Sequence, residues 1–399
     1  MSMSTVFRRR ISPTERMYFP MRDMAPPFLM QLAIPGTGTL DIERLRAAVA
    51  TAAAVTPGAR LRRDGRFWVD TGVPPAVREI TGHTLDHGRL ESDPVLGSAI
   101  GPTAESTCEI LVLTGDPVTV IFRVFHGVMD GMGMVLWVRN VLTALRGGDP
   151  VPLRDPIADR ELVRRIGTSG RPAAMIPRFR AATGHGRQDP GIPRHLLRRR
   201  TIGATGPGAV ARVSALLAEH AGTASRIMVP VDLRRHDPEL RSTANLALPL
   251  FLDIRPGQDW QQVRDRMRAD LRARTELNQM ASSAIANAPH AVGRTILRTT
   301  NALGARFGRN LASATVSHMG RFDLGELAVP GWSPTSVFVL PQHSVAMPLL
   351  FAMTESGGRT DLTVSARNGR GVEPRLEALL DRIAATLESE LPQPDSAVA

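Results

Sequence analysis

One short stretch of the sequence, residues 125–131 (FHGVMDG), combines side chains that suit acid–base chemistry. Histidine is the residue whose ordinary pKa lets it accept and release a proton near neutral pH, so His126 is the candidate base. Asp130, four residues later, can hold the bend that carries the histidine without reacting itself. Gly131 tolerates backbone dihedrals that other residues avoid. This spacing predicts a general base held in a tight, rigid turn.

The residues on either side of this stretch predict a strand that runs into a helix. Residues 118–125 are rich in β-branched and aromatic side chains, which indicates a largely buried strand. Residues 132–145 place apolar side chains at the spacing of one helix face, and Gly147-Gly148 predicts the end of that helix. We therefore expect His126 at a strand-to-helix junction, where its backbone is fixed and its ring can face a cleft.

Similar patterns along the 399 residues predict a mixed α/β architecture in two lobes, each large enough to bury a core. Further helices are expected at 41–54, 210–220, 260–277, 285–307 and 373–387. Further strands are expected at 28–34, 108–113, 227–231, 247–254, 314–317, 337–340, 345–353 and 361–366. Segments 147–156 and 184–193 are rich in Gly, Pro and Asp and are typical of linkers. The predicted division is an N-terminal lobe at 1–170, and a C-terminal lobe that includes the connector at 171–399.

The spacing of His126, Asp130 and Gly131 resembles the HxxxDG signature of a large acyltransferase superfamily. That superfamily includes chloramphenicol acetyltransferase, the condensation domains of nonribosomal peptide synthetases, and the plant and mycobacterial acyl-CoA-dependent acyltransferases. Other segments resemble parts of the same superfamily in the same order, so that the resemblance spans roughly residues 12–368. These segments are 12–16 (SPTER), 57–62 (PGARLR), 229–234 (VPVDLR), 243–250 (TANLALPL) and 316–322 (VSHMGRF).

The resemblance implies a two-lobed, chloramphenicol acetyltransferase-like α/β sandwich with a tunnel between the lobes and the histidine midway along it. It implies an acyltransferase in which His126 takes the proton from an alcohol or amine acceptor. The acceptor would then attack the thioester of an acyl-CoA, or of an acyl-phosphopantetheine on an acyl carrier protein. The acyl thioester would be a co-substrate, and no bound cofactor is expected.

The resemblance also implies a supporting role for Asp130. In the superfamily this carboxylate points away from the substrate and pairs with an arginine, and a buried carboxylate without such a partner would be costly. Arg234 is the first candidate for the partner and Arg62 the second, because both lie in matching segments.

Two groups are candidates to stabilise the oxyanion of the tetrahedral intermediate. They are the backbone N–H of Gly131, at the start of the predicted helix, and the side chain of Ser317, on a strand that faces the tunnel in related proteins. His318 and His343 could also reach the cleft, although a structural role is the alternative for both.

The sequence departs from the superfamily pattern in two places. Phe125 stands where many condensation domains have a first histidine, which weakens the case for peptide-bond formation. The Asp-Phe-Gly-Trp-Gly segment of the plant branch is missing. Two alternatives therefore stay open beside the acyltransferase: a condensation-like enzyme of another reaction type, such as cyclisation or dehydration, and an inactive module that binds carrier proteins.

The net charge of +11 comes entirely from arginine, since the 49 basic residues include no lysine. A nucleic-acid-binding protein would place aromatic side chains among its basic residues, but aromatics make up only 4% of this chain, so no nucleic-acid partner is expected. The arginine-rich region 164–200 could attract the phosphates of CoA or an acidic carrier protein. The alternative is a solvated connector.

Three further observations indicate a cytoplasmic protein without a metal, and we expect a monomer. The only cysteine, Cys108, lies beside an apolar run and is expected in the core. The histidines show no metal-ligand spacing. The sequence shows no apolar run long enough to cross a membrane and no signal peptide.

Overall fold

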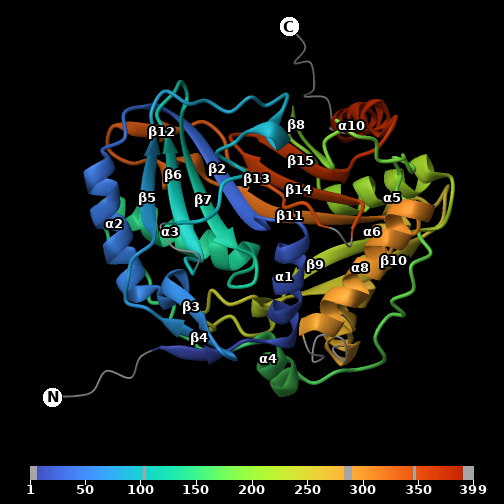
Figure 1. Ribbon diagram of the computed structural model, residues 1–399, viewed down its shortest axis with the longest axis horizontal. Helices are drawn as coiled ribbons and strands as arrows, with labels where there is room; N and C mark the ends of the chain where they lie inside the picture. The colour runs from blue at the N-terminus through green and yellow to red at the C-terminus, as the bar shows by residue number, and fades with distance from the viewer. Residues whose placement is uncertain (1–6, 102–104, 283–289, 345–346, 390–399) are drawn as a thin grey trace, which may run out of the picture.

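The computed structural model describes residues 7–101, 105–282, 290–344 and 347–389. Within these residues, the strands form two six-stranded sheets and one three-stranded sheet (Figure 1). Helices pack against each of the two large sheets, which confirms the predicted α/β class.

The sheet of the first lobe carries the strand that leads to His126. Its strands are β2 (Leu29–Gly38), β5 (Ala76–Ile80), β6 (Cys108–Leu113) and β7 (Val118–Phe125), joined by β12 (Trp332–Pro334) and β13 (Phe338–Leu340). The central strands β6 and β7 are buried along almost their whole length, as expected from their nearly continuous apolar sequence. Helices α2 (Ile42–Val55) and α3 (Gly131–Leu145) pack beside each other against this sheet.

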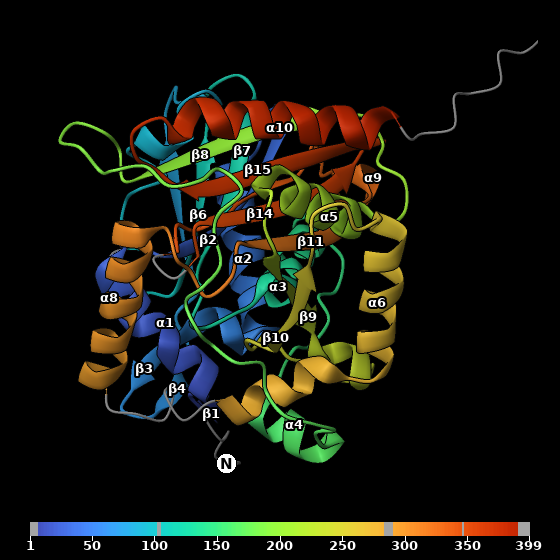
Figure 2. The same ribbon diagram turned by 90° about the vertical axis from the view of Figure 1, so that its right-hand side faces the viewer.

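The sheet of the second lobe combines parallel and antiparallel pairing. Its strands, in spatial order, are β10 (Ala247–Ile254), β9 (Ser225–Asp232), β11 (Ala314–Phe322), β14 (Leu349–Ser356), β15 (Arg359–Arg367) and β8 (His195–Ile202). Helices α5 (Ala209–Ala221), α6 (Trp260–Arg272) and α10 (Val372–Ser389) share one apolar core with this sheet (Figure 2). Helix α8 (His290–Phe307) lies beside α1 (Pro13–Met24) of the first lobe.

The remaining elements are short. The three-stranded sheet consists of β1 (Arg8–Arg10), β4 (Phe67–Asp70) and β3 (Leu61–Asp64). The other short helices are α4 (Asp159–Ile166), α9 (Leu324–Leu327), and the 3-10 turns η1 (Pro57–Arg60), η2 (Leu90–Ser92), η3 (Leu233–His236) and η4 (Thr275–Ser282). None of the helices among the described residues combines the length and the apolar character needed to cross a bilayer.

The chain returns from the second lobe to complete the first sheet. Strands β12 and β13 both pair with β2. Trp332 of β12 is buried against Gly36 of β2, where an added Cβ would lie only 2.4 Å from the indole ring. The predicted C-terminal lobe, 171–399, therefore supplies strands to the sheet of the N-terminal lobe.

Most predicted elements are confirmed to within a few residues, and the differences have local causes. The predicted helix 260–277 ends at Arg272, because Arg274 adopts a left-handed backbone conformation with φ of 57° and η4 follows. Residues 285–289 of one predicted helix and 345–346 of one predicted strand lie outside the described residues.

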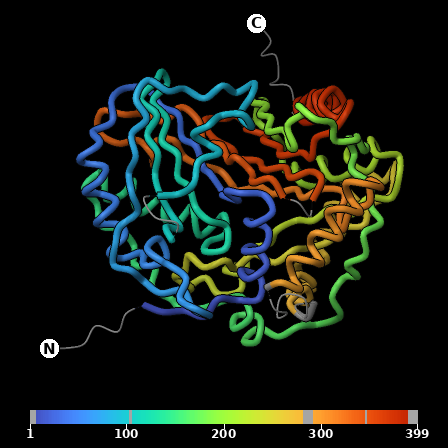
Figure 3. The backbone as a smooth tube through the Cα atoms, in the orientation of Figure 1, coloured from blue at the N-terminus to red at the C-terminus, as the bar shows by residue number. Residues whose placement is uncertain are grey.

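The arginine-rich region is a connector only in part. Residues 167–194 contain neither helix nor strand and run along the outside of the second lobe (Figure 3). Residues 195–202, in contrast, form β8, in which consecutive arginines bind acidic side chains of the same protein. Arg198 binds Glu91, Glu373 and Glu377, Arg199 binds Asp361, and Arg200 binds Glu377 and Asp381. For these three arginines, the predictions of a solvated connector and of a site for an anionic partner are both wrong.

Candidate active site

His126 lies in the loop between β7 and α3, so the predicted strand-to-helix junction is confirmed. Its side chain is half-buried. Phe125, immediately before it, is buried between the rings of Phe19 and Trp68 and anchors the end of the strand. These contacts with residues of the first lobe fix the backbone that carries the histidine.

Hydrogen bonding fixes which nitrogen of His126 carries the proton. Nδ1 lies 3.1 Å from the carbonyl oxygen of Met129, and because a carbonyl only accepts, Nδ1 donates and Nε2 holds the lone pair. Nε2 makes no hydrogen bond to any residue that the structure describes. Burial lowers the pKa of His126, an effect that the Met129 hydrogen bond and the charge of Asp130 oppose only in part. The ring is therefore a neutral base at pH 7.

Two aromatic rings lie against the imidazole. Tyr18 of α1 stacks on it with a centroid distance of 4.4 Å and an interplanar angle of 18°. Phe28, just before β2, lies 6.4 Å from it at 20°. Tyr18 is the only tyrosine of the chain, and burial raises its pKa, so its phenol stays protonated and uncharged. These rings set the orientation of the imidazole plane.

Asn245 supports the histidine from the second lobe. Its side-chain Nδ2 donates a hydrogen bond of 2.8 Å to the carbonyl oxygen of His126 and lies 3.4 Å from Nδ1. Asn245 is buried and lies just before β10. Sequence reasoning identified its segment, 243–250, but not its contact with the histidine, which only the packing of the two lobes creates.

The carboxylate of Asp130 is fully occupied by protein donors. Oδ1 accepts from the backbone N–H of Gly133 at 2.6 Å and so caps the N-terminus of α3. Oδ2 accepts from Arg234 Nη1 at 2.9 Å and from the backbone N–H of Leu246 at 2.6 Å. With only 2% of the residue exposed, this carboxylate is placed to hold the loop rather than to contact a substrate.

Arg234, the first candidate, is the arginine that lies at Asp130. Its guanidinium also binds Asp232 and donates to the carbonyl oxygens of Ser242 and Ala244 at 2.9 and 2.8 Å. Burial works to lower the pKa of Arg234, but the carboxylates of Asp130 and Asp232 raise it overall, so the ion pair stays charged. It ties the start of α3 to the segment between β9 and β10.

Arg62, the second candidate, is not at the motif. It lies on β3, more than half of its side chain is exposed, and its ionic partner is the exposed Glu105 at 3.5 Å. The prediction that it supports Asp130 is wrong. The physical reason is that the short strand β3 carries this side chain on its solvent-exposed side.

A second anchor of the loop was missed by sequence reasoning. Arg9 of β1 is 3% exposed, and its Nη2 donates to the carbonyl oxygen of Val128 at 2.8 Å. Its Nη1 lies 2.6 Å from Glu15 Oε1, and Glu15 also accepts from the backbone N–H of Ser12 and from Trp68 Nε1. The segment 12–16 noted in the sequence thus forms the capping box of α1, and its Glu15 binds Arg9, which donates to the loop.

The two oxyanion candidates lie on facing elements around the side chain of Met319. An added Cβ at Gly131 would lie 2.4 Å from Met319 Cε, and Ser317 Oγ lies 4.0 Å from Met319 Sδ. His318 is engaged elsewhere: its Nε2 lies 3.1 Å from Glu355, and its Nδ1 accepts from the backbone N–H of Gly320. Gly131 and Ser317 therefore remain candidates, while His318 has a structural role.

The described residues give little support to a metal centre or to a cysteine nucleophile. No group of three or more His, Cys, Asp or Glu side chains among the described residues could hold a metal ion. Cys108 is buried in β6, as predicted, and burial raises the pKa of its thiol to about 12, which makes it a poor nucleophile.

The sequence matches no protein-family model and no curated protein. The fold, however, matches solved condensation domains along nearly the whole chain. A mutant of the starter condensation domain of rhizomide synthetase RzmA, in complex with C8-CoA and Leu-SNAC, is 15% identical with a TM-score of 0.64, over 99% of this chain and 97% of that one. The condensation domain of the Monacolin K polyketide synthase MokA is 14% identical with a TM-score of 0.62, over 97% and 98% of the two chains.

Polyketide synthase associated protein 5 from Mycobacterium tuberculosis is equally similar, at 15% identity and a TM-score of 0.63, over 98% of this chain and 100% of that one. The predicted fold class, a chloramphenicol acetyltransferase-like α/β sandwich, is therefore confirmed by its match to the fold of condensation domains. At these identities the likeness establishes the fold and leaves the reaction to be argued from the site.

Proposed function

We propose that this protein is an acyltransferase that moves an acyl group from a CoA or carrier-protein thioester to an alcohol or amine, with His126 as the general base. The observation that carries the proposal is the state of the imidazole: its proton is held on Nδ1 by Met129, which leaves Nε2 as a free base. The fold adds support, because a starter condensation domain that shares it was solved with C8-CoA.

In the proposed reaction, Nε2 of His126 takes the proton of the acceptor O–H or N–H while the oxygen or nitrogen attacks the thioester carbon. The resulting tetrahedral oxyanion accepts hydrogen bonds, for which the Gly131 N–H and Ser317 hydroxyl are our candidates. Collapse of the intermediate breaks the C–S bond. The proton on Nε2 then passes to the departing thiolate, so the products are an ester or amide and a free thiol.

The remaining groups of the site position the base. Asp130 with Arg234, and Arg9 with Glu15, hold opposite sides of the loop, and neither carboxylate is needed for proton transfer in this scheme. We further propose that a tunnel between the lobes brings donor and acceptor to His126 from opposite sides, which favours transfer over hydrolysis. On this proposal the protein acts as a cytoplasmic monomer without a bound cofactor.

The direct test is release of free thiol from a panel of acyl-CoAs and acylated carrier proteins, each with and without mixed alcohol and amine acceptors. We expect thiol release that depends on the acceptor, together with an acylated product detected by mass spectrometry. Thioester binding without thiol release would instead identify an inactive binding module. Loss of water from the donor, or a cyclised product, would identify another reaction type.

The pH dependence of transfer should report the pKa of His126. Because burial lowers this pKa below its ordinary value of 6.5, Nε2 is protonated, and the base lost, only in acid. We expect kcat/KM to rise with pH along a limb whose midpoint lies below 6.5 and to be constant from pH 7 to 8. The measurement is kcat/KM between pH 4.5 and 8, with donor binding followed over the same range as the control. A midpoint above 6.5 would contradict the proposed environment of the ring.

A further inference from the structure

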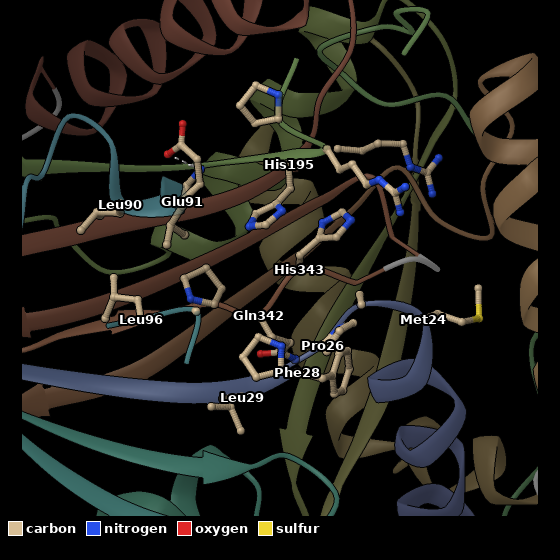
Figure 4. A pocket seen from close by; sticks show the side chains of 18 of the residues that line it. Met24, Pro26, Phe28, Leu29, Leu90, Glu91, Leu96, His195, Gln342 and His343 are labelled. Carbon is tan, nitrogen blue, oxygen red and sulfur yellow. Dashed lines mark hydrogen bonds between the residues drawn. The ribbon is translucent and has the colours of Figure 1, made fainter. Parts of the chain in front are cut away.

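A second feature of the structure is a cavity of about 680 Å³ between the two lobes (Figure 4). The first lobe contributes the end of α1 and the start of β2. The second lobe contributes α8, the start of β8 and the segment that follows β13. Phe28 lines this cavity, and its ring also lies 6.4 Å from that of His126, so this one side chain contacts both the cavity and the candidate base, which is not itself a lining residue.

Two imidazole rings line the cavity, and their nitrogens are not engaged by other described residues. His195 and His343 stack with a centroid distance of 4.8 Å and an interplanar angle of 10°, and Figure 4 shows the two rings side by side on the cavity wall. Their ring nitrogens make no hydrogen bond to any residue that the structure describes. Burial lowers the pKa of both, that of His343 to about 3, so each ring is neutral and offers one N–H donor and one lone pair.

Two of the charged side chains that line the cavity are engaged by protein groups. Glu91 binds Arg198 Nη1 with both carboxylate oxygens, at 2.9 and 2.8 Å. Arg367 donates to the amide oxygens of Asn301 and Asn310, at 3.1 and 3.0 Å. Arg194 is exposed to solvent. Apart from the solvent-exposed Arg194, the hydrogen-bonding capacity left on the wall is therefore that of uncharged groups.

Gln342 adds to this uncharged set. Figure 4 shows it next to His343, and its amide makes no hydrogen bond to the residues that the structure describes. Phe28, Leu29 and Leu96 add apolar side chains to the wall. A ligand that matches both kinds of lining carries neutral hydrogen-bonding groups and a hydrocarbon part.

We infer that this cavity binds the acyl acceptor, and that the acceptor is an uncharged amphipathic molecule with hydroxyl or amide groups beyond the one that reacts. His195, His343 and Gln342 bind those groups, and Phe28 and Leu29 contact the apolar part. The inference rests on the proposed function, because it assumes that the acceptor bound in the cavity presents its reacting group to His126. It favours an alcohol over an amine, since an ammonium group finds no free carboxylate among these residues.

The test uses octyl β-D-glucoside as an uncharged probe, with octanoate and octylamine as charged probes of equal chain length, all below their micelle concentrations. Binding to the full-length protein is measured by saturation-transfer difference NMR. The double variant His195→Phe/His343→Phe keeps two stacked rings and removes all four nitrogens. His220→Phe, on α5 and outside the cavity, is the matched control. Circular dichroism checks that each variant is folded.

We expect the glucoside to bind the wild type and the His220→Phe control equally, and at least about tenfold more weakly to the double variant, as the loss of its hydrogen bonds predicts. Both charged probes should bind the wild type at least about tenfold more weakly than the glucoside. Equal affinity of wild type and double variant, or preference for a charged probe, would overturn the inference. So would stoichiometric binding of Zn²⁺ that the double variant abolishes, since the imidazole pair would then be a metal site.

Acyl transfer separates this inference from the proposed function. If transfer to an alcohol is measured, the double variant should raise the acceptor KM about tenfold and leave kcat nearly unchanged, because neither histidine touches the reacting atoms. An unchanged KM in an active enzyme overturns the inference alone. The opposite outcome is a protein that binds the glucoside through the two histidines but transfers no acyl group to any acceptor. That outcome overturns the proposed function, while the inferred ligand class of the cavity stands.

Discussion

Replacement of His126 by glutamine is expected to lower kcat/KM for acyl transfer by roughly 100- to 10,000-fold, the usual contribution of a general base. Glutamine is close to histidine in size, and its amide N–H can still donate to the Met129 carbonyl, so the loop keeps its main contact. What the variant lacks is a lone pair that accepts a proton at neutral pH. The measurement is acceptor-dependent thiol release under conditions where the wild type is active.

The control for this variant is His220→Gln, which changes the same residue type on α5, away from the loop. Both variants should unfold close to the wild-type temperature, because His126→Gln keeps the hydrogen bond from Asn245 to the carbonyl oxygen of residue 126 and glutamine can still donate to Met129. The acid limb of the pH profile should disappear from any residual activity of His126→Gln. Wild-type activity in this variant would eliminate His126 as the base.

Asp130→Ala is expected to lower the free energy of unfolding by about 3–5 kcal/mol, the range found when one partner of a buried ion pair is removed. The substitution deletes three hydrogen bonds and leaves the guanidinium of Arg234 buried with only Asp232 as a counterion. The measurement is urea denaturation followed by tryptophan fluorescence, for which Trp137 of α3 is a nearby reporter.

Asp41→Ala separates the ion pair from helix capping. Asp41 caps α2 as Asp130 caps α3, but it is exposed, and among the described residues its side chain accepts a hydrogen bond only from the backbone N–H of Arg44. Its loss should cost about 1 kcal/mol. The double variant Asp130→Ala/Arg234→Met should be less destabilised than the two single changes added together, since neither partner of the buried Asp130–Arg234 pair is left behind and the 30% exposed Asp232 keeps contact with solvent. A variant Asp130→Ala that is as stable as the wild type but inactive would mean that this carboxylate takes part in the chemistry.

The parts of the fold that sequence predicts well are those with an uninterrupted local pattern. Strands β6 and β7 read as apolar runs, and α2 shows both its capping aspartate and its apolar face. Strand β8 shows no such pattern, because Arg198, Arg199 and Arg200 interrupt the alternation of apolar and polar residues that would indicate a strand. Those arginines are compatible with a strand only because acids distant in sequence neutralise them, which no local window contains.

The candidate site divides in the same way. His126, Asp130 and Arg234 follow from a motif and its resemblance to known segments. Tyr18 and Arg9 do not, because each reaches the loop from the N-terminal elements across a large separation in sequence. The ring stacking of Tyr18 and the guanidinium contact of Arg9 depend on how α1 and β1 pack against β7. Such contacts can be inferred only when the tertiary arrangement is known.

The pairing of β12 and β13 with β2 means that the two halves of the molecule are not separable folding units. A fragment that stops at residue 170 would lack Trp332 and expose the backbone edge of β2, and it should be prone to aggregate rather than to fold alone. The same strands act as a covalent and hydrogen-bonded tether, so a wide, hinge-like opening of one half from the other would require breaking a sheet. In the proposed function, the entry of substrates would therefore not depend on such an opening.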